Sequence, residues 1–365
     1  MTAVALMTAF ASYAQDKPVS WINNVKLSGY GIVQYQSSSK VNDKSNSFSL
    51  RLARVSLDGR ILDDFYWKAQ IQFNGNTTDL GNSPRVVDLF AEWQKYGYFK
   101  IKAGQFKRPF SFENPMHPVD QGFMSYSQIT SSIAGFNDRA GAHASNGRDI
   151  GVQLQGDFLP NANGRNLLHY QVGVFNGQGI NVKDVDQRKD IIGGVWVMPV
   201  AGMRIGAFGW TGSYARKRTV QTNQGNVTEI LSLPQRRYAF SAEYVANDWT
   251  FRSEYAHSTG LAFKTRYQKP ENATDFTLSN DGDKAQGVYA LVIAPIIKKK
   301  MHAKARYDMY QPSGDASKQK TFYEVGLDYE FCRNLKLSGE YAFVNDRSLT
   351  KHNYNMVDVE LAFRF

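Results

Sequence analysis

The sequence is poor in cysteine and lacks long hydrophobic runs. Cys332 is the single cysteine in 365 residues, which excludes an intrachain disulfide framework and, by itself, a cysteine-based zinc finger. It falls in an expected tight turn, and we assign it no role. Beyond the N-terminus no stretch reaches about 18 consecutive apolar residues, so the chain offers no candidate transmembrane helix.

Sequence patterns of hydrolytic or metal chemistry are also missing. The chain contains no G-x-S-x-G or HExxH pattern, and none of its 6 histidines lies in a recognisable nucleophile motif. His117 and His143 share one long predicted loop, but no cysteine or acidic residue accompanies them at metal-ligand spacing. We therefore expect no enzyme, metal or cofactor, and keep an outer-membrane hydrolase only as an alternative hypothesis.

What the chain does have is basic charge and aromatic rings. Lys and Arg number 43 against 33 Asp and Glu, a net charge of +10, and 13% of the residues are Phe, Tyr or Trp. A basic balance indicates nucleic acid, an anionic membrane surface or small anions as partners. Nucleic-acid binders cluster their basic residues on one helix or face. Here these residues are spread along alternating segments, so no nucleic acid is expected.

Within the last ten residues, Met356 to Phe365, apolar side chains alternate from Val357 onward with polar or small ones. Successive side chains of a strand point to opposite faces, so this segment has one apolar face and one face with three charges. A soluble protein would turn the apolar face to its core, whereas a membrane barrel turns it to lipid and the charges to a wet lumen. The terminal Phe resembles the end of bacterial outer-membrane barrels.

The same alternation continues along the chain. Strand-like segments of roughly 8 to 14 residues are predicted at 16 places: 25–35, 48–61, 65–74, 85–94, 98–105, 148–158, 166–176, 190–199, 203–214, 236–246, 249–257, 285–294, 301–310, 321–331, 335–344 and 355–365. About ten tilted residues cover the roughly 25 Å apolar band of an outer membrane. Strands of soluble sandwiches are shorter, usually about five or six residues.

The predicted connections alternate between short and long. Short ones, rich in Gly, Asn and Asp, lie at 62–64, 95–97, 200–202, 247–248 and 332–334. Long ones lie at 36–47, 75–84, 106–147, 177–189, 215–235, 258–284, 311–320 and 345–354. This layout predicts an all-β fold, a 16-stranded antiparallel transmembrane β-barrel with short periplasmic turns and long extracellular loops. The long third loop, 106–147, is expected to fold into the lumen as a constriction loop anchored by Glu113.

Two local features refine this prediction. Residues 1–14 read as a secretory signal peptide cleaved after Ala14, although its positive start is missing, which leaves 15–365 as the barrel. The alternation of the second segment slips around Leu52, which predicts a β-bulge there.

Four segments of the first half carry a family resemblance. These segments resemble, in the order in which they occur along the chain, four segments of the phosphate-selective porin O and P family. They are LRLARV at 50–55 (LRRAR in the family), GQFKRPFSFE at 104–113 (GQFK-x-PFS-x-E), RDIG at 148–151 (R-x-IG) and VFNG at 174–177 (FNG). The resemblance implies an outer-membrane barrel, usually trimeric, with Arg and Lys lining the pore and diffusion of anions such as phosphate or polyphosphate. Leu52 stands where the family pattern has its second Arg, so this chain has one basic side chain fewer in the row that is expected to line the pore.

We therefore expect a porin in the outer membrane of a Gram-negative bacterium, embedded in outer-membrane lipid, trimeric, and passing small hydrophilic solutes, above all anions. The first candidates for anion contact are Arg51, Arg54, Lys107, Arg108, Arg139 and Arg148. The second candidates, Lys68, Lys100 and Lys102, alternate onto predicted lumen faces. Guanidinium groups are permanently charged, and their fork geometry suits phosphate.

Two alternatives remain open at this stage. The basic residues can instead form structural ion pairs, because Asp88 and Glu92 face the predicted lumen and Asp149 follows Arg148. The barrel can also be a non-conducting adhesin or surface-binding protein, with loops 215–235 and 258–284 contacting a partner. Ion conductance separates a porin from an adhesin.

Overall fold

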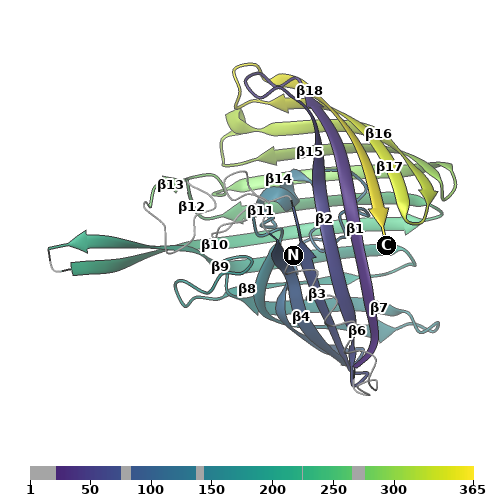
Figure 1. Cartoon of the computed structure of the whole chain (residues 1–365), viewed down its shortest axis with the longest axis horizontal. Helices are drawn as coiled ribbons and strands as arrows, with labels where there is room; N and C mark the ends of the chain where they lie inside the picture. The colour runs from purple at the N-terminus through teal and green to yellow at the C-terminus, as the bar shows by residue number, and fades with distance from the viewer. Residues whose placement is uncertain (1–21, 75–83, 137–143, 224, 265–275) are drawn as a thin grey trace, which may run out of the picture.

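The computed structural model describes residues 22–74, 84–136, 144–223, 225–264 and 276–365. The predicted signal peptide at 1–14, Arg139 and His143 lie outside these residues. All described strands except β12 and β13 form one closed antiparallel barrel, in which successive barrel strands pair with one another and β1 pairs with β18 (Figure 1). The barrel has 16 strands, so the predicted fold class is confirmed.

The barrel strands are β1 (Ile22–Ser38), β2 (Ser45–Ile61), β3 (Phe65–Gln72), β4 (Arg85–Tyr96), β5 (Phe99–Lys107), β6 (Arg148–Pro160), β7 (Asn166–Phe175), β8 (Asp190–Val197), β9 (Met203–Thr222), β10 (Gly225–Ala246), β11 (Trp249–Thr259), β14 (Ala285–Ile297), β15 (Met301–Gln311), β16 (Lys320–Cys332), β17 (Leu335–Asp346) and β18 (Asn353–Arg364). A small separate hairpin joins β12 (Ala262–Phe263) to β13 (Leu278–Ser279).

In the described part of the chain, short helical segments interrupt the loops at α2 (Gln128–Ser132), in the third loop, and at the 3-10 helix η3 (Ala316–Lys318). Among the described residues, no helix has the length and apolar character needed to cross a membrane.

The two faces of the strands differ as the alternation predicts. On β16, Tyr323 and Val325 are 51% and 55% exposed, whereas Glu324 between them is only 7% exposed. On this strand the exposed side chains are therefore apolar and the covered one is charged, the reverse of a soluble protein. An apolar exterior of this kind requires lipid as its solvent, as in a multi-pass transmembrane β-barrel.

The C-terminal strand closes the barrel against the first strand. Their register pairs Tyr30 with Arg364 and continues to Ser38 opposite Met356. The rings of Phe363 and Phe365 lie over glycines of β1, because a Cβ at Gly29 would sit 2.3 Å from the Phe365 ring. The glycines of β1 therefore make room for the C-terminal aromatic rings at the seam.

The predicted bulge is confirmed in β2. Ile32 pairs with Leu52 and Val33 with Leu50, so Arg51 is the extra residue of the longer strand. Leu50 on one side of it is exposed, while Leu52 on the other packs against the buried cluster of Tyr30 and Ile32. The bulge therefore lets Arg51 and Leu52 both turn to the inside, where Arg51 reaches Glu360.

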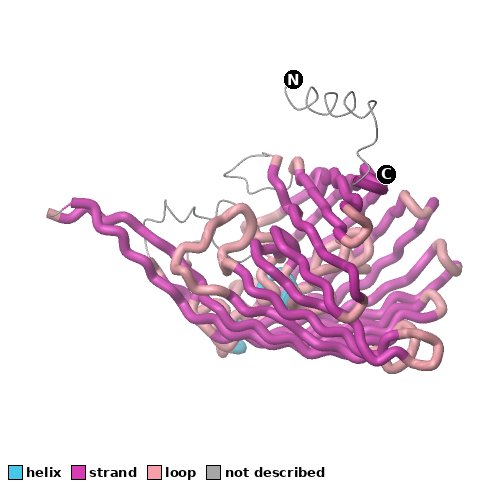
Figure 2. Tube along the Cα trace, turned by 90° about the horizontal axis from the view of Figure 1, so that it is seen from below, coloured by secondary structure: helices cyan, strands magenta, loops and turns pink. Residues whose placement is uncertain are grey.

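Segment 215–235, predicted as a loop, is not one. β9 and β10 continue through it as a paired hairpin with register from Arg236 opposite Thr211 to Gly225 opposite Thr222. This ribbon projects beyond the neighbouring strands at the long-loop rim (Figures 1 and 2). Its tip is rich in Thr, Gln and Asn, which obscured the alternation, while Tyr214 and Leu233 hold its base together.

The turn that was expected to contain Cys332 is shorter than predicted. Cys332 is the last residue of β16, pairs with Leu335 of β17 and is exposed, so the reversal involves Arg333 and Asn334. Within the loop predicted at 258–284, part of the chain forms the small β12–β13 hairpin.

The third loop lies inside the barrel. Phe110, Phe112, Phe123, Ile129 and Ile133 of this loop are almost completely buried and form one apolar cluster. The wall contributes Phe175 and Ile192 from β7 and β8, Phe208 and Trp210 from β9, and Tyr289 from β14. An apolar core formed by the loop and these strands therefore fills part of the lumen.

Candidate functional site: a basic cavity beside the third loop

Carboxylates of the barrel wall hold the backbone of the third loop. Glu254 on β11 accepts hydrogen bonds from the backbone N–H groups of Phe112 and Glu113, each at 2.8 Å. Glu340 on β17 accepts from the N–H of Met124 and Asp308 on β15 from that of Gln128, each at 2.9 Å. Charged acceptors make the stronger class of hydrogen bond, so these contacts fix the path of the loop.

Basic residues of the same wall bind the loop carbonyls. Arg252 donates to Gln121 O at 2.8 Å, Lys304 to Gly122 O at 2.9 Å, Arg306 to Ser125 O at 2.8 Å and Lys336 to Val119 O at 2.6 Å. Three of these cations also pair with wall carboxylates, Arg252 with Glu243, Lys304 with Glu340 and Arg306 with Glu324. This half of the barrel, β10 to β17, therefore uses its positive charge to dock the loop.

The loop is also braced internally. Glu113 is fully buried and accepts hydrogen bonds from the backbone N–H of Ser127 at 3.0 Å and from its hydroxyl at 2.5 Å. The expectation that Glu113 anchors the loop agrees with these contacts. Asn114 donates to Arg108 O at 2.9 Å, and Gly147 at the loop's end has a φ of +71° with no space for a Cβ beside the Asn114 side chain.

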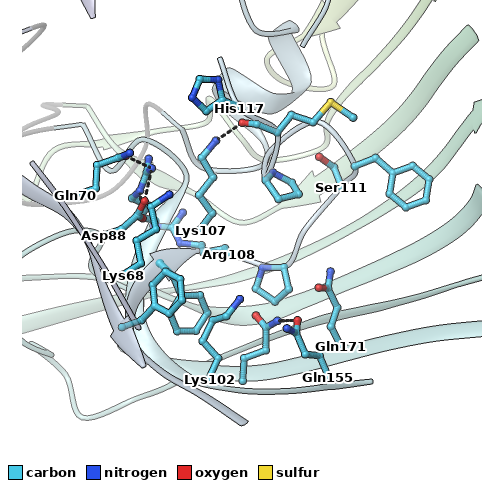
Figure 3. Close-up of a pocket in the computed structure, with 18 of the residues that line it drawn as sticks. Lys68, Gln70, Asp88, Lys102, Lys107, Arg108, Ser111, His117, Gln155 and Gln171 are labelled. Atoms are coloured by element: carbon cyan, nitrogen blue, oxygen red, sulfur yellow. Dashed lines mark hydrogen bonds and ion pairs between the residues drawn. The ribbon is translucent and has the colours of Figure 1, made fainter. Parts of the chain in front are cut away.

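A cavity of about 470 Å³ lies between the start of the third loop and strands β1 to β9 (Figure 3). Among the described residues, seven Lys and Arg side chains line it, together with a single carboxylate, that of Asp88. The basic residues are Arg54, Lys68, Lys102, Lys107, Arg108, Arg148 and Arg204. The cavity is therefore a positively charged compartment on the wall opposite the docked loop.

The structure brings six of the sequence candidates to this cavity: Arg54, Lys68, Lys102, Lys107, Arg108 and Arg148. Arg51 and Lys100 are not among its lining residues and form ion pairs, with Glu360 at 2.6 Å and Asp157 at 3.4 Å. Arg139 lies outside the described residues.

Several of the cavity cations are held by other groups. Arg148 Nε lies 2.6 Å from Asp88 Oδ1 and its Nη2 3.1 Å from Oδ2, a two-point ion pair. Arg108 is fully buried, with Nε 3.4 Å from Asp149 and its guanidinium over the Trp210 ring. Lys107 donates to Asn114 O at 2.6 Å and Met116 O at 2.9 Å.

Arg54 and Lys68 differ from these residues. Within the described part of the chain neither has a carboxylate at ion-pair distance. Arg54 donates to Gln72 Oε1 and Tyr30 OH, both at 2.8 Å, so its charge is oriented by neutral groups. Within the described structure Lys107 also lacks an ion pair, but loop carbonyls hold its ammonium group, so Arg54 and Lys68 are the cavity cations held by neither a carboxylate nor the loop.

Sequence reasoning missed Arg204 on β9. Its guanidinium lies 4.1 Å from the Phe112 ring centroid and its Nε 2.8 Å from Glu243, and it reaches the cavity from the far side. Arg204 has the lumen-facing parity of its strand, which was a signal available in the sequence. It lies outside the four recognised segments, which drew attention to the first half of the chain.

His117 borders the cavity from the loop. Its ring meets that of Tyr30 edge-on at 4.4 Å, and Nδ1 accepts from the backbone N–H of Val119. Burial, together with the positive charge of Arg364, lowers the pKa of His117 to about 4. The imidazole is therefore neutral at neutral pH and adds no charge to the cavity.

Comparisons with known proteins agree with this architecture. A family model described as phosphate-selective porin O and P matches residues 29–189, which include all four recognised segments. The search of curated proteins gave no match. Three similar solved structures are an OmpF of Salmonella typhi in complex with daunomycin, the outer membrane channel DcaP of Acinetobacter baumannii and OprB of Pseudomonas putida.

The structural similarity covers nearly the whole barrel. OmpF aligns with a TM-score of 0.65 at 14% identity over 94% of this chain and 98% of its own. DcaP aligns at 0.60 and 13% over 96% and 99%, and OprB at 0.61 and 11% over 98% and 97%. At such identities the likeness shows the fold, while the family match carries the sequence relationship. The chain is therefore a 16-stranded outer-membrane β-barrel of the porin type that is similar, over residues 29–189, to the phosphate-selective porin O and P family.

Proposed function

We propose that the protein lets small hydrophilic anions diffuse passively across the outer membrane and selects them at the basic cavity beside the third loop. The observation that carries this proposal is the excess of seven basic side chains over one carboxylate in the lining of the cavity. Charged side chains at a constriction raise the local concentration of ions of opposite sign.

The two cations held by neither a carboxylate nor the loop carbonyls, Arg54 and Lys68, carry most of this effect. Two unit charges about 4 Å apart attract by about 1 kcal/mol in water and by about 4 kcal/mol at an effective dielectric constant of about 20. Arg54 and Lys68 act over this range on a passing anion, whereas Asp88 largely cancels the charge of Arg148. Several weak contacts of this size attract an anion without trapping it.

The docking of the loop explains why anions are selected on the cavity side of the barrel and not on the side that holds the loop. Arg252, Lys304 and Arg306 are engaged by carboxylates and loop carbonyls, so their charge is not available to a solute. The anion path therefore follows β1 to β9, where the cavity is. Phosphate is a suitable solute, because the guanidinium fork of Arg54 matches its oxygens.

Three further expectations belong to this proposal. The family resemblance implies a homotrimer, the N-terminal pattern implies export with cleavage after Ala14, and membrane insertion implies contact with outer-membrane lipid. Size-exclusion chromatography with light scattering and N-terminal sequencing of the purified protein test the first two.

The test is ion conductance in planar bilayers. Stepwise chloride currents that fall when phosphate is added are expected, because phosphate would occupy the cavity and obstruct smaller ions. Lys68→Ala should weaken this phosphate block, whereas Lys351→Ala, which removes an exposed loop lysine, should leave it unchanged.

Two results would contradict the proposal. Conductance without any phosphate block would remove the anion site but keep the channel. Absence of conductance from folded, heat-modifiable protein would remove the channel, and the surface-binding alternative would then rest on the projecting β9–β10 hairpin.

A further inference from the structure

The cavity has a second end with a different chemistry. Away from Arg54 and Lys68, its lining consists of the amides Gln153, Gln155 and Gln171 together with His169. Figure 3 shows Gln155 and Gln171 side by side on one side of the cavity, with Lys68 and Asp88 on the other. Attraction of an anion does not require these amides.

A chain of hydrogen bonds fixes the orientation of two of them. Gln155 Nε2 donates to Glu92 Oε1 at 2.5 Å, since a carboxylate only accepts, and Gln155 Oε1 accepts from Gln153 Nε2 at 2.6 Å. The carbonyl oxygen of Gln153 is therefore left as a free acceptor. Gln153 is only 3% exposed, and among the described residues this Oε1 has no hydrogen-bond partner.

His169 presents a second acceptor. Its Nδ1 lies 2.8 Å from Asp157 Oδ1 and carries the proton that this contact needs, so in the neutral ring Nε2 accepts. Nε2 is buried and has no partner in the described structure. The ring stacks on Trp196 at 3.9 Å, which fixes its orientation. Gln171, which makes no side-chain hydrogen bond in the described structure, lies directly opposite Gln155 in the β6–β7 register.

Buried acceptors of this kind are costly unless a donor reaches them. An anionic oxygen does not serve, because it is itself an acceptor and is repelled by Gln153 Oε1 and His169 Nε2. A hydroxyl group does serve, because it donates to one atom and accepts from another. The ring of Trp196 adds an apolar edge suited to the C–H groups between hydroxyls.

We propose that the cavity binds phosphorylated sugars or polyols in transit, with the phosphate at Arg54 and Lys68 and the hydroxyl groups at Gln153, Gln171 and His169. This inference rests on the proposed function and names its substrate class. The volume of 470 Å³ falls within the range of about 300–1,000 Å³ that is usual for sites of small molecules.

The test compares how three solutes block the ion current of the whole protein in planar bilayers: glucose 6-phosphate, inorganic phosphate and glucose. Glucose 6-phosphate should bind about tenfold more tightly than phosphate, the gain of one or two hydrogen bonds to buried groups. Glucose alone should block weakly, because it lacks the charge that Arg54 and Lys68 attract.

Leucine variants locate the hydroxyl-binding end. Gln153→Leu and Gln171→Leu should remove the advantage of glucose 6-phosphate and leave the block by inorganic phosphate unchanged. Gln171 is only half-buried, so its variant keeps the test intact if Gln153→Leu does not fold. Gln311→Leu, on β15 and outside the cavity lining, is the matched control and should behave like the unmodified protein.

The outcomes separate this inference from the proposed function. Equal block by phosphate and glucose 6-phosphate, unaffected by Gln171→Leu, would overturn the inference while the anion site stands. Conductance that neither phosphate nor glucose 6-phosphate blocks would overturn both. Block by glucose as strong as that by glucose 6-phosphate would also overturn the inference, because the site would then recognise neutral sugars.

Discussion

Lys304 of β15 and Glu340 of β17 form an ion pair of 2.6 Å across the intervening strand β16, and each also holds the third loop. Lys304 donates to the carbonyl of Gly122 and Glu340 accepts the N–H of Met124. Two loop residues are thus bound on either side of Phe123 by one buried pair of opposite charges. The path of the loop and the stability of the wall are therefore coupled.

Replacing one partner of this ion pair should destabilise the barrel more than replacing both partners together. Lys304→Met leaves Glu340 buried without its cation, which should destabilise the barrel by about 3–5 kcal/mol. The double variant Lys304→Met with Glu340→Gln should recover part of this loss, because no unpaired charge remains. Urea unfolding in detergent measures the free energy of unfolding of the two single variants and of the double variant. A double variant whose loss of stability equals the sum of the losses in Lys304→Met and Glu340→Gln would contradict the coupling.

Glu254→Leu should release the first part of the loop. The N–H groups of Phe112 and Glu113 would lose their acceptor, at a cost of about 1–3 kcal/mol for each buried group. We expect a lower unfolding midpoint and a larger, noisier single-channel current, because the loop would no longer be fixed. Glu229→Ala breaks only the partly exposed pair with Arg218 on the projecting hairpin and should change stability by less than about 1 kcal/mol. An unchanged current in Glu254→Leu would contradict the docking role.

Variants of Arg148 and Lys68 should distinguish a residue that stabilises the fold from one that sets anion preference. Arg148→Ala leaves Asp88 buried without its partner and should lower stability, because Asp88 binds it at two points. Lys68→Ala breaks no ion pair in the described structure and should leave the unfolding midpoint within about 0.5 kcal/mol while reducing anion preference. Equal effects of the two variants on stability would show that Lys68 is structural.

The lowered pKa of His117 predicts a pH dependence of stability. The folded ring binds its proton only near pH 4, whereas an unfolded histidine binds it near about pH 6.5. Between these values the unfolded chain holds more protons, so stability is full above about pH 6.5 and falls as the pH decreases toward 4. The ring of His117→Phe cannot be protonated, so this variant should lose less stability over the window. Urea unfolding at several pH values measures this loss. An equal loss of stability between pH 7 and pH 4 in the unmodified protein and in His117→Phe would contradict the role given to His117.

Much of the fold followed from alternation alone. Residues such as Tyr323, Glu324 and Val325 predict which face meets lipid, because parity along a strand is a local property. The bulge at Arg51 was also visible locally, as a slip of phase before Leu52. The interior position of the loop was expected from its own apolar residues, Phe110 and Phe112 among them.

The candidate site was only partly accessible to the same reasoning. Which cations stay without a carboxylate depends on contacts between distant residues, such as Met124 with Glu340 or Arg51 with Glu360, and no local pattern reports them. The sequence pointed to Asp149 as the neighbour of Arg148, but Arg148 pairs with Asp88 and Asp149 with Arg108. Arg204 enters the cavity from β9 only because the barrel closes around the loop.

The most direct test of the account is the reversal potential in a potassium chloride gradient, measured for the unmodified protein and for Lys68→Glu. The account predicts a reversal potential on the chloride side that moves toward the potassium side when Lys68 is replaced by Glu. A reversal potential near zero, or one unaffected by Lys68→Glu, would contradict selection of anions at the basic cavity.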